Sequence, residues 1–174
     1  MDKGLDFLKS QVNNAVMAHQ SFVDALKSHA DEADDPRYRD LCNRYIPIMQ
    51  EHQVRLEAYQ RTLGGDVGLA KKMMGKVAGA ARGLADVARE DDFLRLVGDI
   101  LMARQGEDTF KTFREAGRAL GNTELAEIGA LGERQHDSYV ADANRLVQAM
   151  FVEHVRGVER GEQIRAGVEP RSAP

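Results

Sequence analysis

Four segments of the sequence repeat apolar residues at alternating spacings of three and four, and this periodicity limits the fold more than any other feature. In the first segment the repeat consists of Leu5, Leu8, Val12, Val16, Phe22 or Val23, and Leu26. Residues 38–63, 93–110 and 125–150 follow the same spacing. Since such a repeat lines one face of an α-helix, each segment is predicted to form an amphipathic helix. Four such helices bury their apolar faces against each other, so an all-α protein built as an antiparallel four-helix bundle is expected.

Capping residues divide the chain into two helical hairpins. Asp35 before Pro36 is typical of a helix N-cap followed by proline at the first helical position. The other predicted helix ends are marked by caps or glycines at Gly64–Gly65, Asp92, Gly121, and Asn122 or Thr123. Residues 64–91 are too long for a hairpin loop and are predicted to form a crossover containing an extra helix. The bundle is assigned to residues 1–160, and residues 161–174 are predicted to be a flexible C-terminal tail.

Composition and charge argue against nucleic-acid binding and against a membrane span. The 174 residues are 43% apolar and 30% charged, with a net charge of -4, which is typical of a single globular domain. Basic residues are interleaved with acidic ones, so nucleic-acid binding is not expected. The sequence has no run of about 18 uncharged apolar residues that could span a membrane. With Cys42 as its single cysteine and no apolar N-terminal run, the chain is expected to be cytoplasmic, and Cys42 is expected to pack in the core.

Gly75, Gly79 and Gly83 repeat every four residues in the crossover. Such a repeat gives a smooth helix face that another helix can approach closely. The crossover helix is predicted to pack on its own bundle, and the alternative is contact with a partner or a membrane surface. A homodimer is the favoured oligomeric state.

Each apolar face carries one polar residue near its middle. These residues are His19, His52, Glu107 and His136. A helix rises about 1.5 Å per residue and each hairpin reverses the chain, so all four positions map to similar heights in the bundle. Buried imidazole and carboxylate groups cost free energy unless they are paired. The four side chains are therefore predicted to pair with one another or with a metal ion.

The helix order, the crossover and the heights of these residues resemble the ferritin-like superfamily. Its di-iron members carry one glutamate on each of two helices and a Glu-x-x-His pair on each of the other two. The last predicted helix contains such a pair, Glu133-Arg134-Gln135-His136, and Glu107 corresponds to the lone glutamate of the helix before it. The first hairpin departs from the pattern, because His19 stands where a glutamate would be and the second motif reads Met49-Gln50-Glu51-His52. The Gly-rich crossover is also similar to that of bacterial stress-associated ferritin-like proteins.

Two functions are compatible with this incomplete ligand set. The candidate metal ligands are His19, His52, Glu107, Glu133 and His136. They would hold a single iron, manganese or zinc ion, or an asymmetric pair, and the loss of carboxylates favours one ion. Iron oxidation or peroxide consumption would be the family chemistry, but enzymatic activity is left unassigned. The alternative is a metal-free bundle with a structural or protein-interaction role. The resemblance implies a stress-related role. His29 and His154 lie near predicted helix ends, away from the four polar positions, and are expected to be solvated.

Overall fold

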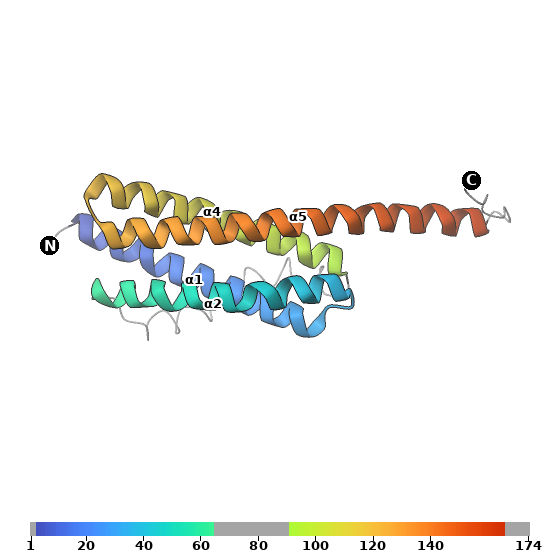
Figure 1. Ribbon diagram of the computed structural model, residues 1–174, viewed down its shortest axis with the longest axis horizontal. Coiled ribbons are helices and arrows are strands. Elements are labelled where there is room, and N and C mark those ends of the chain that lie inside the picture. The colour runs from blue at the N-terminus through green and yellow to red at the C-terminus, as the bar shows by residue number, and fades with distance from the viewer. Residues whose placement is uncertain (1–2, 65–90, 166–174) are drawn as a thin grey trace.

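The computed structural model describes residues 3–64 and 91–165, with side chains as far as residue 157. Within these ranges the chain forms helices and no strands (Figure 1). The helices are α1 (Lys3–Glu32), α2 (Pro36–Thr62), α4 (Asp92–Leu120) and α5 (Thr123–Arg165). The prediction of an all-α protein is confirmed, and the helices pack as a bundle. The predicted crossover helix, with its repeated glycines, lies outside the described residues.

Three of the capping residues that the sequence predicts mark helix ends in the structure, whereas α4 is capped by Asp91, one residue before the predicted start. The carboxylate of Asp35 accepts a hydrogen bond from the backbone N–H of Arg37 at 2.8 Å, which satisfies one free donor in the first turn of α2. Gly121 ends α4 with a φ of 65°, a left-handed conformation that glycine adopts without strain. Asn122 caps α5, because its side-chain oxygen accepts from the N–H of Leu125 at 3.0 Å.

Two hydrogen bonds show how the hairpins lie beside each other. The backbone N–H of Asp35, between α1 and α2, donates to the Asp92 carboxylate at 2.7 Å, so this loop lies at the start of α4. At the other end, Asn122 donates to the Tyr59 hydroxyl at 2.8 Å, which places the loop between α4 and α5 beside the end of α2. Each hairpin therefore contacts the other along its length, with α1 on α4 and α2 on α5.

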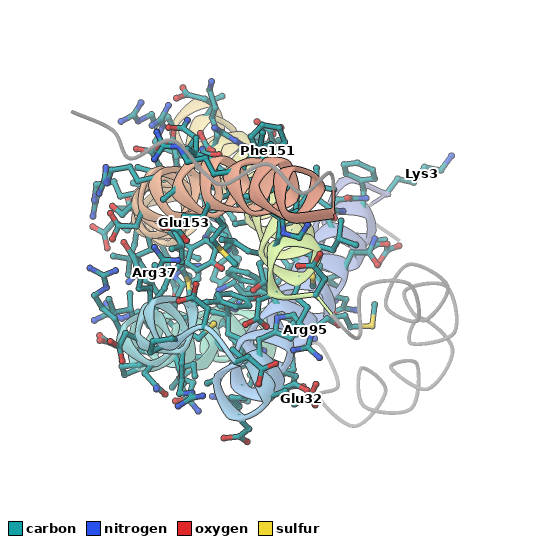
Figure 2. The ribbon with its side chains drawn as sticks, turned by 90° about the vertical axis from the view of Figure 1, so that its right-hand side faces the viewer. Lys3, Glu32, Arg37, Arg95, Phe151 and Glu153 are labelled. Carbon is teal, nitrogen blue, oxygen red and sulfur yellow. The ribbon has the colours of Figure 1, made fainter. Side chains whose placement is uncertain are left out.

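Ion pairs also join the elements at the start of α2 and α4. Arg37 donates through both terminal nitrogens to Glu153 on α5, each at 2.8 Å (Figure 2). Arg95 on α4 pairs with Glu32 of α1 at 3.7 Å and, within its own helix, with Asp92 at 3.1 Å. Pairs that are exposed to solvent contribute at most about 1 kcal/mol each. Their role is to fix the ends of the hairpins relative to each other.

The α5 helix is longer than the sequence pattern suggests. It continues past the ends of the other helices (Figure 1) and reaches Arg165, so residues 161–165 of the predicted tail are helical. Residues 166–174 lie outside the described residues. None of the described helices has an apolar stretch long enough to cross a membrane.

The apolar core is divided into two clusters along the bundle axis. One cluster is built around Phe22, Leu26, Tyr38, Leu41, Met49, Leu96 and Tyr139. The other is built around Val12, Val16, Leu56, Phe110, Phe113 and Leu125. On α1, α2 and α5 the residue between the two clusters is a histidine. Polar side chains therefore separate the two halves of the core.

Close backbone packing joins α4 to α5. A Cβ atom on Gly129 of α5 would collide with the backbone N of Arg114 and would lie 2.7 Å from the carbonyl oxygen of Phe110. A Cβ atom on Gly117 of α4 would likewise collide with the backbone of Ala126. Because the opposing atoms belong to helix backbone, only glycine allows the two helices to approach this closely.

Candidate metal centre

His19 of α1, His52 of α2 and His136 of α5 meet in the middle of the bundle. We call these three residues the three-histidine centre. Their exposed fractions are 3%, 0% and 1%, so all three rings are removed from solvent. The ring centroid of His19 lies 5.0 Å from that of His52 and 5.2 Å from that of His136. Three helices that are distant in the sequence thus contribute one imidazole each to a single site.

Aromatic rings and glycines enclose the three-histidine centre. The ring of Phe110 on α4 lies 4.6 Å from His52, 5.1 Å from His136 and 5.7 Å from His19, measured between centroids. A Cβ atom on Gly132 would lie 2.7 Å from Nε2 of His52, and one on Gly106 would lie 2.5 Å from Nε2 of His136. The two glycines therefore provide the space that the imidazoles occupy.

Hydrogen bonds fix the tautomer of two of the rings. His19 Nδ1 lies 2.8 Å from the amide oxygen of Gln53, whose amide nitrogen donates to the Glu57 carboxylate. His136 Nδ1 lies 2.8 Å from the backbone carbonyl oxygen of Gly132. Both partners are acceptors, so Nδ1 carries the proton in each ring and Nε2 presents a lone pair.

Three of the other ring nitrogens are buried and unpaired. Nε2 of His19 and both ring nitrogens of His52 are buried without a hydrogen-bond partner in the described part of the protein. A buried polar atom that lacks a partner costs about 1–3 kcal/mol. Such groups are rare in folded proteins, and each requires an explanation. Here three of them lie within one cluster of rings.

All three imidazoles are neutral at pH 7. Burial, followed by repulsion from a neighbouring imidazole, lowers the pKa of His19, His52 and His136 from 6.5 to about 3. The Arg55 guanidinium lowers the pKa of His52 further. Neutral imidazole is the form of histidine that binds metal ions.

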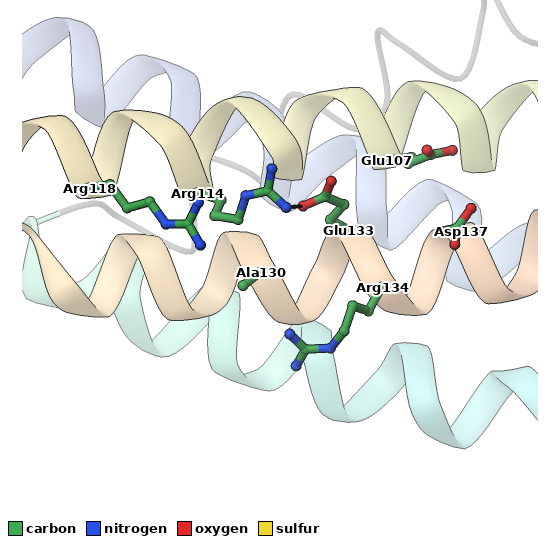
Figure 3. A pocket seen from close by; sticks show the side chains of 7 residues that line it. All are labelled: Glu107, Arg114, Arg118, Ala130, Glu133, Arg134 and Asp137. Carbon is green, nitrogen blue, oxygen red and sulfur yellow. Dashed lines mark hydrogen bonds and ion pairs between the residues drawn. The ribbon is translucent and has the colours of Figure 1, made fainter.

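The two glutamates proposed as ligands lie elsewhere. Glu107 pairs with Arg104 at 3.1 Å, and Glu133 forms an ion pair with Arg114 (Figure 3). Both line a surface groove between α4 and α5 whose other residues are Arg114, Arg118, Ala130, Arg134 and Asp137. Glu107 is partly buried, with a side chain 22% exposed, but it is Gly106 that faces His136, and the next residue points about 100° away from it.

The five candidate ligands are therefore not assembled as a set. The structure brings His19, His52 and His136 together and leaves Glu107 and Glu133 in ion pairs. In residues 3–64 and 91–157, no group of three or more His, Cys, Asp or Glu side chains is arranged to hold a metal ion. Metal binding by the five residues remains a prediction, and any ion at the three histidines would require one ring to turn.

A second polar cluster was not predicted from the sequence. Asp99 of α4 is only 1% exposed, and its Oδ2 atom accepts from the Tyr38 hydroxyl at 2.6 Å, from His29 Nδ1 at 3.1 Å and from the Tyr139 hydroxyl at 3.3 Å. Burial, and then the Asp99 charge, raise the pKa of Tyr38 and Tyr139 far above the ordinary value, so both hydroxyls remain donors. The sequence signal was the spacing of Leu96, Asp99 and Ala103, which places the aspartate on the buried face.

Three expectations about single residues can be compared with the structure. His29 was expected to be solvated, which is wrong, because its side chain is 21% exposed and bonds to Asp99. His154 is exposed, as expected. Cys42 packs in the apolar core, and burial raises the pKa of its thiol, so the prediction of a packing role is confirmed.

Comparison with protein-family models, with curated proteins and with solved structures finds no match to this chain. The function therefore has to be argued from the geometry of the site.

The unpaired nitrogens of His52 lead to a prediction about stability. In chelator-treated protein at pH 7, His52→Leu is expected to raise the free energy of unfolding by about 1 kcal/mol, because two buried polar atoms without partners are replaced by apolar ones. The matched variant His136→Leu should lower it, since it removes the formed hydrogen bond between the imidazole and the Gly132 carbonyl oxygen. Urea denaturation measures both values. A loss of stability in His52→Leu equal to that in His136→Leu would contradict the assignment.

Proposed function

We propose that this protein is an antiparallel, ferritin-like four-helix bundle that binds one transition-metal ion through His19, His52 and His136. The observation that carries the proposal is the set of unpaired, buried imidazole nitrogens at the three-histidine centre. A metal ion bound there would accept the lone pairs that have no other partner. The free energy lost by burying these nitrogens would then be recovered on binding.

The partners of the rings support the same function. Histidines that bind a metal usually donate their other ring N–H to a carbonyl or carboxylate oxygen, which fixes the tautomer and the ring orientation. His19 and His136 each make such a bond, to Gln53 and to Gly132. His52 makes none, so its ring can turn without breaking a hydrogen bond. It is the ring that we expect to move on binding.

The separation of the rings also fits a shared ion. Metal ions lie about 2.0–2.1 Å from a histidine nitrogen, so imidazoles that bind one ion tetrahedrally have centroids roughly 5 Å apart. The observed centroid distances are 5.0 Å and 5.2 Å. The two distances therefore match this spacing for His19 with each of the other two rings.

The di-iron group of the superfamily does not fit these residues. It requires bridging carboxylates, and both Glu107 and Glu133 are engaged by arginines in the groove between α4 and α5. We therefore derive no oxidation step from iron pairs. Imidazole nitrogen is a ligand for zinc, copper, iron and nickel, whereas manganese prefers oxygen ligands. The bound ion would be held as cargo or as a structural element. As the sequence leads us to expect, the protein would act in the cytoplasm and in a stress-related role.

A metal-free bundle is the second candidate. The observation that favours it is the packing of the three imidazoles around Phe110 with no ligand group already arranged for an ion. In that case the centre is an aromatic packing layer, and the protein acts through its surface, alone or as a homodimer.

Metal analysis separates the two candidates. Protein purified without chelator should contain about one metal ion per chain. In chelator-treated protein, an added ion at 100 times its Kd should raise the free energy of unfolding by about 2.7 kcal/mol, seen as a higher Tm. The thermal melts would be run with Zn(II), Fe(II), Mn(II), Co(II) and Cu(I). If none of these ions is found or raises the Tm, the metal-free candidate is correct.

Variants test which residues hold the ion. His136→Ala and His19→Ala are expected to abolish the thermal shift. Glu133→Gln and Glu107→Gln should retain it, because these carboxylates lie in the surface groove, and His154→Ala is the control for an exposed histidine. A shift that survives in His136→Ala would place the site elsewhere. A shift lost in Glu133→Gln would favour the larger ligand set predicted from the sequence.

A further inference from the structure

The surroundings of the three-histidine centre restrict the charge of the ion that it can hold. Its rings contact Phe110, Phe22, the amide of Gln53 and the backbone of Gly132, all of which are uncharged. The Arg55 guanidinium is exposed and paired with Glu51 at 2.8 Å, so it adds no net charge to the centre. Glu57 reaches the centre only through the Gln53 amide, from which it accepts at 2.8 Å, and Glu107 and Glu133 are held in ion pairs with arginines.

A neutral ligand set leaves the whole charge of the ion uncompensated. The electrostatic cost of burying an ion in a medium of low dielectric constant rises with the square of its charge, so a divalent ion costs about four times as much as a monovalent one. Proteins usually reduce this cost with carboxylate, thiolate or bound hydroxide. In the described structure none of the contacts of the three rings supplies such an anion.

The coordination number of the bound ion also disfavours a divalent metal. Zinc held by three histidines keeps a fourth position for water or substrate. Here the three rings are at most 3% exposed and all contact Phe110, so a water ligand would have to be buried among aromatic rings. The cuprous ion accepts low coordination numbers and needs no bound water. Met49, fully buried one turn before His52 on the same face of α2, places a soft thioether on the adjoining turn.

We infer that the three-histidine centre selects the monovalent, soft Cu(I) ion over divalent transition metals. The inference rests on the proposed function, since it names the ion for that same site. It concerns binding alone, and the ion enters and leaves in the cuprous state. The protein would then hold reduced copper inside its helical bundle, shielded from water by Phe110 and the flanking apolar clusters.

Competition titrations test the inference. The chelator-treated full chain is titrated anaerobically with Cu(I) against a coloured Cu(I) chelator, and in parallel with Zn(II), Fe(II) and Mn(II) against a coloured chelator for divalent ions. We expect one Cu(I) per chain, bound on the order of 100-fold more tightly than any of the divalent ions. Tighter binding of a divalent ion would overturn the inference and leave the proposed function standing. If no ion binds, both fail.

Matched variants and X-ray absorption identify the ligands. His136→Ala should abolish Cu(I) binding, whereas Cys42→Ser, which removes the single thiol, should bind as the wild type does. X-ray absorption at the copper edge of the wild-type complex does not depend on any variant folding, and it should show imidazole nitrogens around copper. A thiolate sulfur in that spectrum, or the loss of binding in Cys42→Ser, would overturn the inference.

His52→Asp supplies one negative charge and should shift the preference toward Zn(II). An unchanged preference in folded His52→Asp would contradict the charge argument.

Discussion

Lowering the pH from 7 to 5 is expected to remove about 6 kcal/mol from the free energy of unfolding of the metal-free protein. The pKa of His19, His52 and His136 is about 3 in the folded protein and 6.5 in a free histidine, so the unfolded chain binds more protons than the folded one between these values. Stability is therefore retained above pH 6.5 and lost as the pH falls toward 3. At pH 5 each ring contributes about 2 kcal/mol to the loss.

Such a loss is a large fraction of the stability of a typical domain, about 5–15 kcal/mol, so much less urea should unfold the protein in mild acid. Urea denaturation at several pH values between about 7 and 5, followed by circular dichroism, measures the effect. His52→Leu removes one of the three rings and should reduce the loss to about 4 kcal/mol. His154→Gln, which removes an exposed imidazole, should leave the loss unchanged. A pH profile of His52→Leu identical to that of the wild type would show that the buried rings are not responsible.

Helix positions could be predicted because their signals are local. Asp35, Gly121 and Asn122 act on the backbone within a few residues, through a hydrogen bond or a left-handed φ, and the structure shows each of these interactions. The spacing of apolar residues likewise depends only on the helical repeat. The extension of α5 to Arg165 was missed because residues 161–165 have no apolar repeat, although they continue an established helix.

The candidate site was only partly predictable, because the direction of a side chain is harder to obtain than its height. Height changes by about 1.5 Å per residue, whereas direction turns by about 100°. An error of one residue therefore hardly changes the predicted height of a side chain, but it turns the predicted direction by about 100°, which can move the residue off the buried face. Glu107 was assigned to the position at which Gly106 faces His136. The partners of the rings, such as Gln53 on His19, depend on packing between helices and have no local sequence signal.

The two glycines on either side of the three-histidine centre show why the missed positions matter. A glycine in a repeat of apolar residues carries no hydrophobic signal, yet Gly106 and Gly132 provide the room for the rings of His136 and His52. Glycine within a helix costs about 1 kcal/mol relative to alanine. That cost is incurred where α4 and α5 must accommodate an imidazole. The positions of these glycines are thus as informative about the site as the histidines themselves.

The close contact between α4 and α5 leads to the second large effect. Gly129→Ala is expected to lower the free energy of unfolding by about 3 kcal/mol or more, because the new Cβ atom would collide with the Arg114 backbone and lie 2.7 Å from the Phe110 carbonyl oxygen. Helix backbone cannot yield as a flexible side chain does, so the two helices must separate. Since Phe110 lies against all three rings, the separation should also weaken metal binding at the three-histidine centre.

Gly98→Ala is the matched control, because Gly98 lies within α4 and a Cβ atom there has no neighbour within 4 Å. This variant should gain about 1 kcal/mol from the higher helix propensity of alanine and should bind metal as the wild type does. Urea denaturation of both variants therefore gives changes of opposite sign for the same chemical substitution. Equal stability of the two would mean that α4 and α5 do not touch at Gly129, and the space assigned to the imidazoles between these helices would then have to be reconsidered.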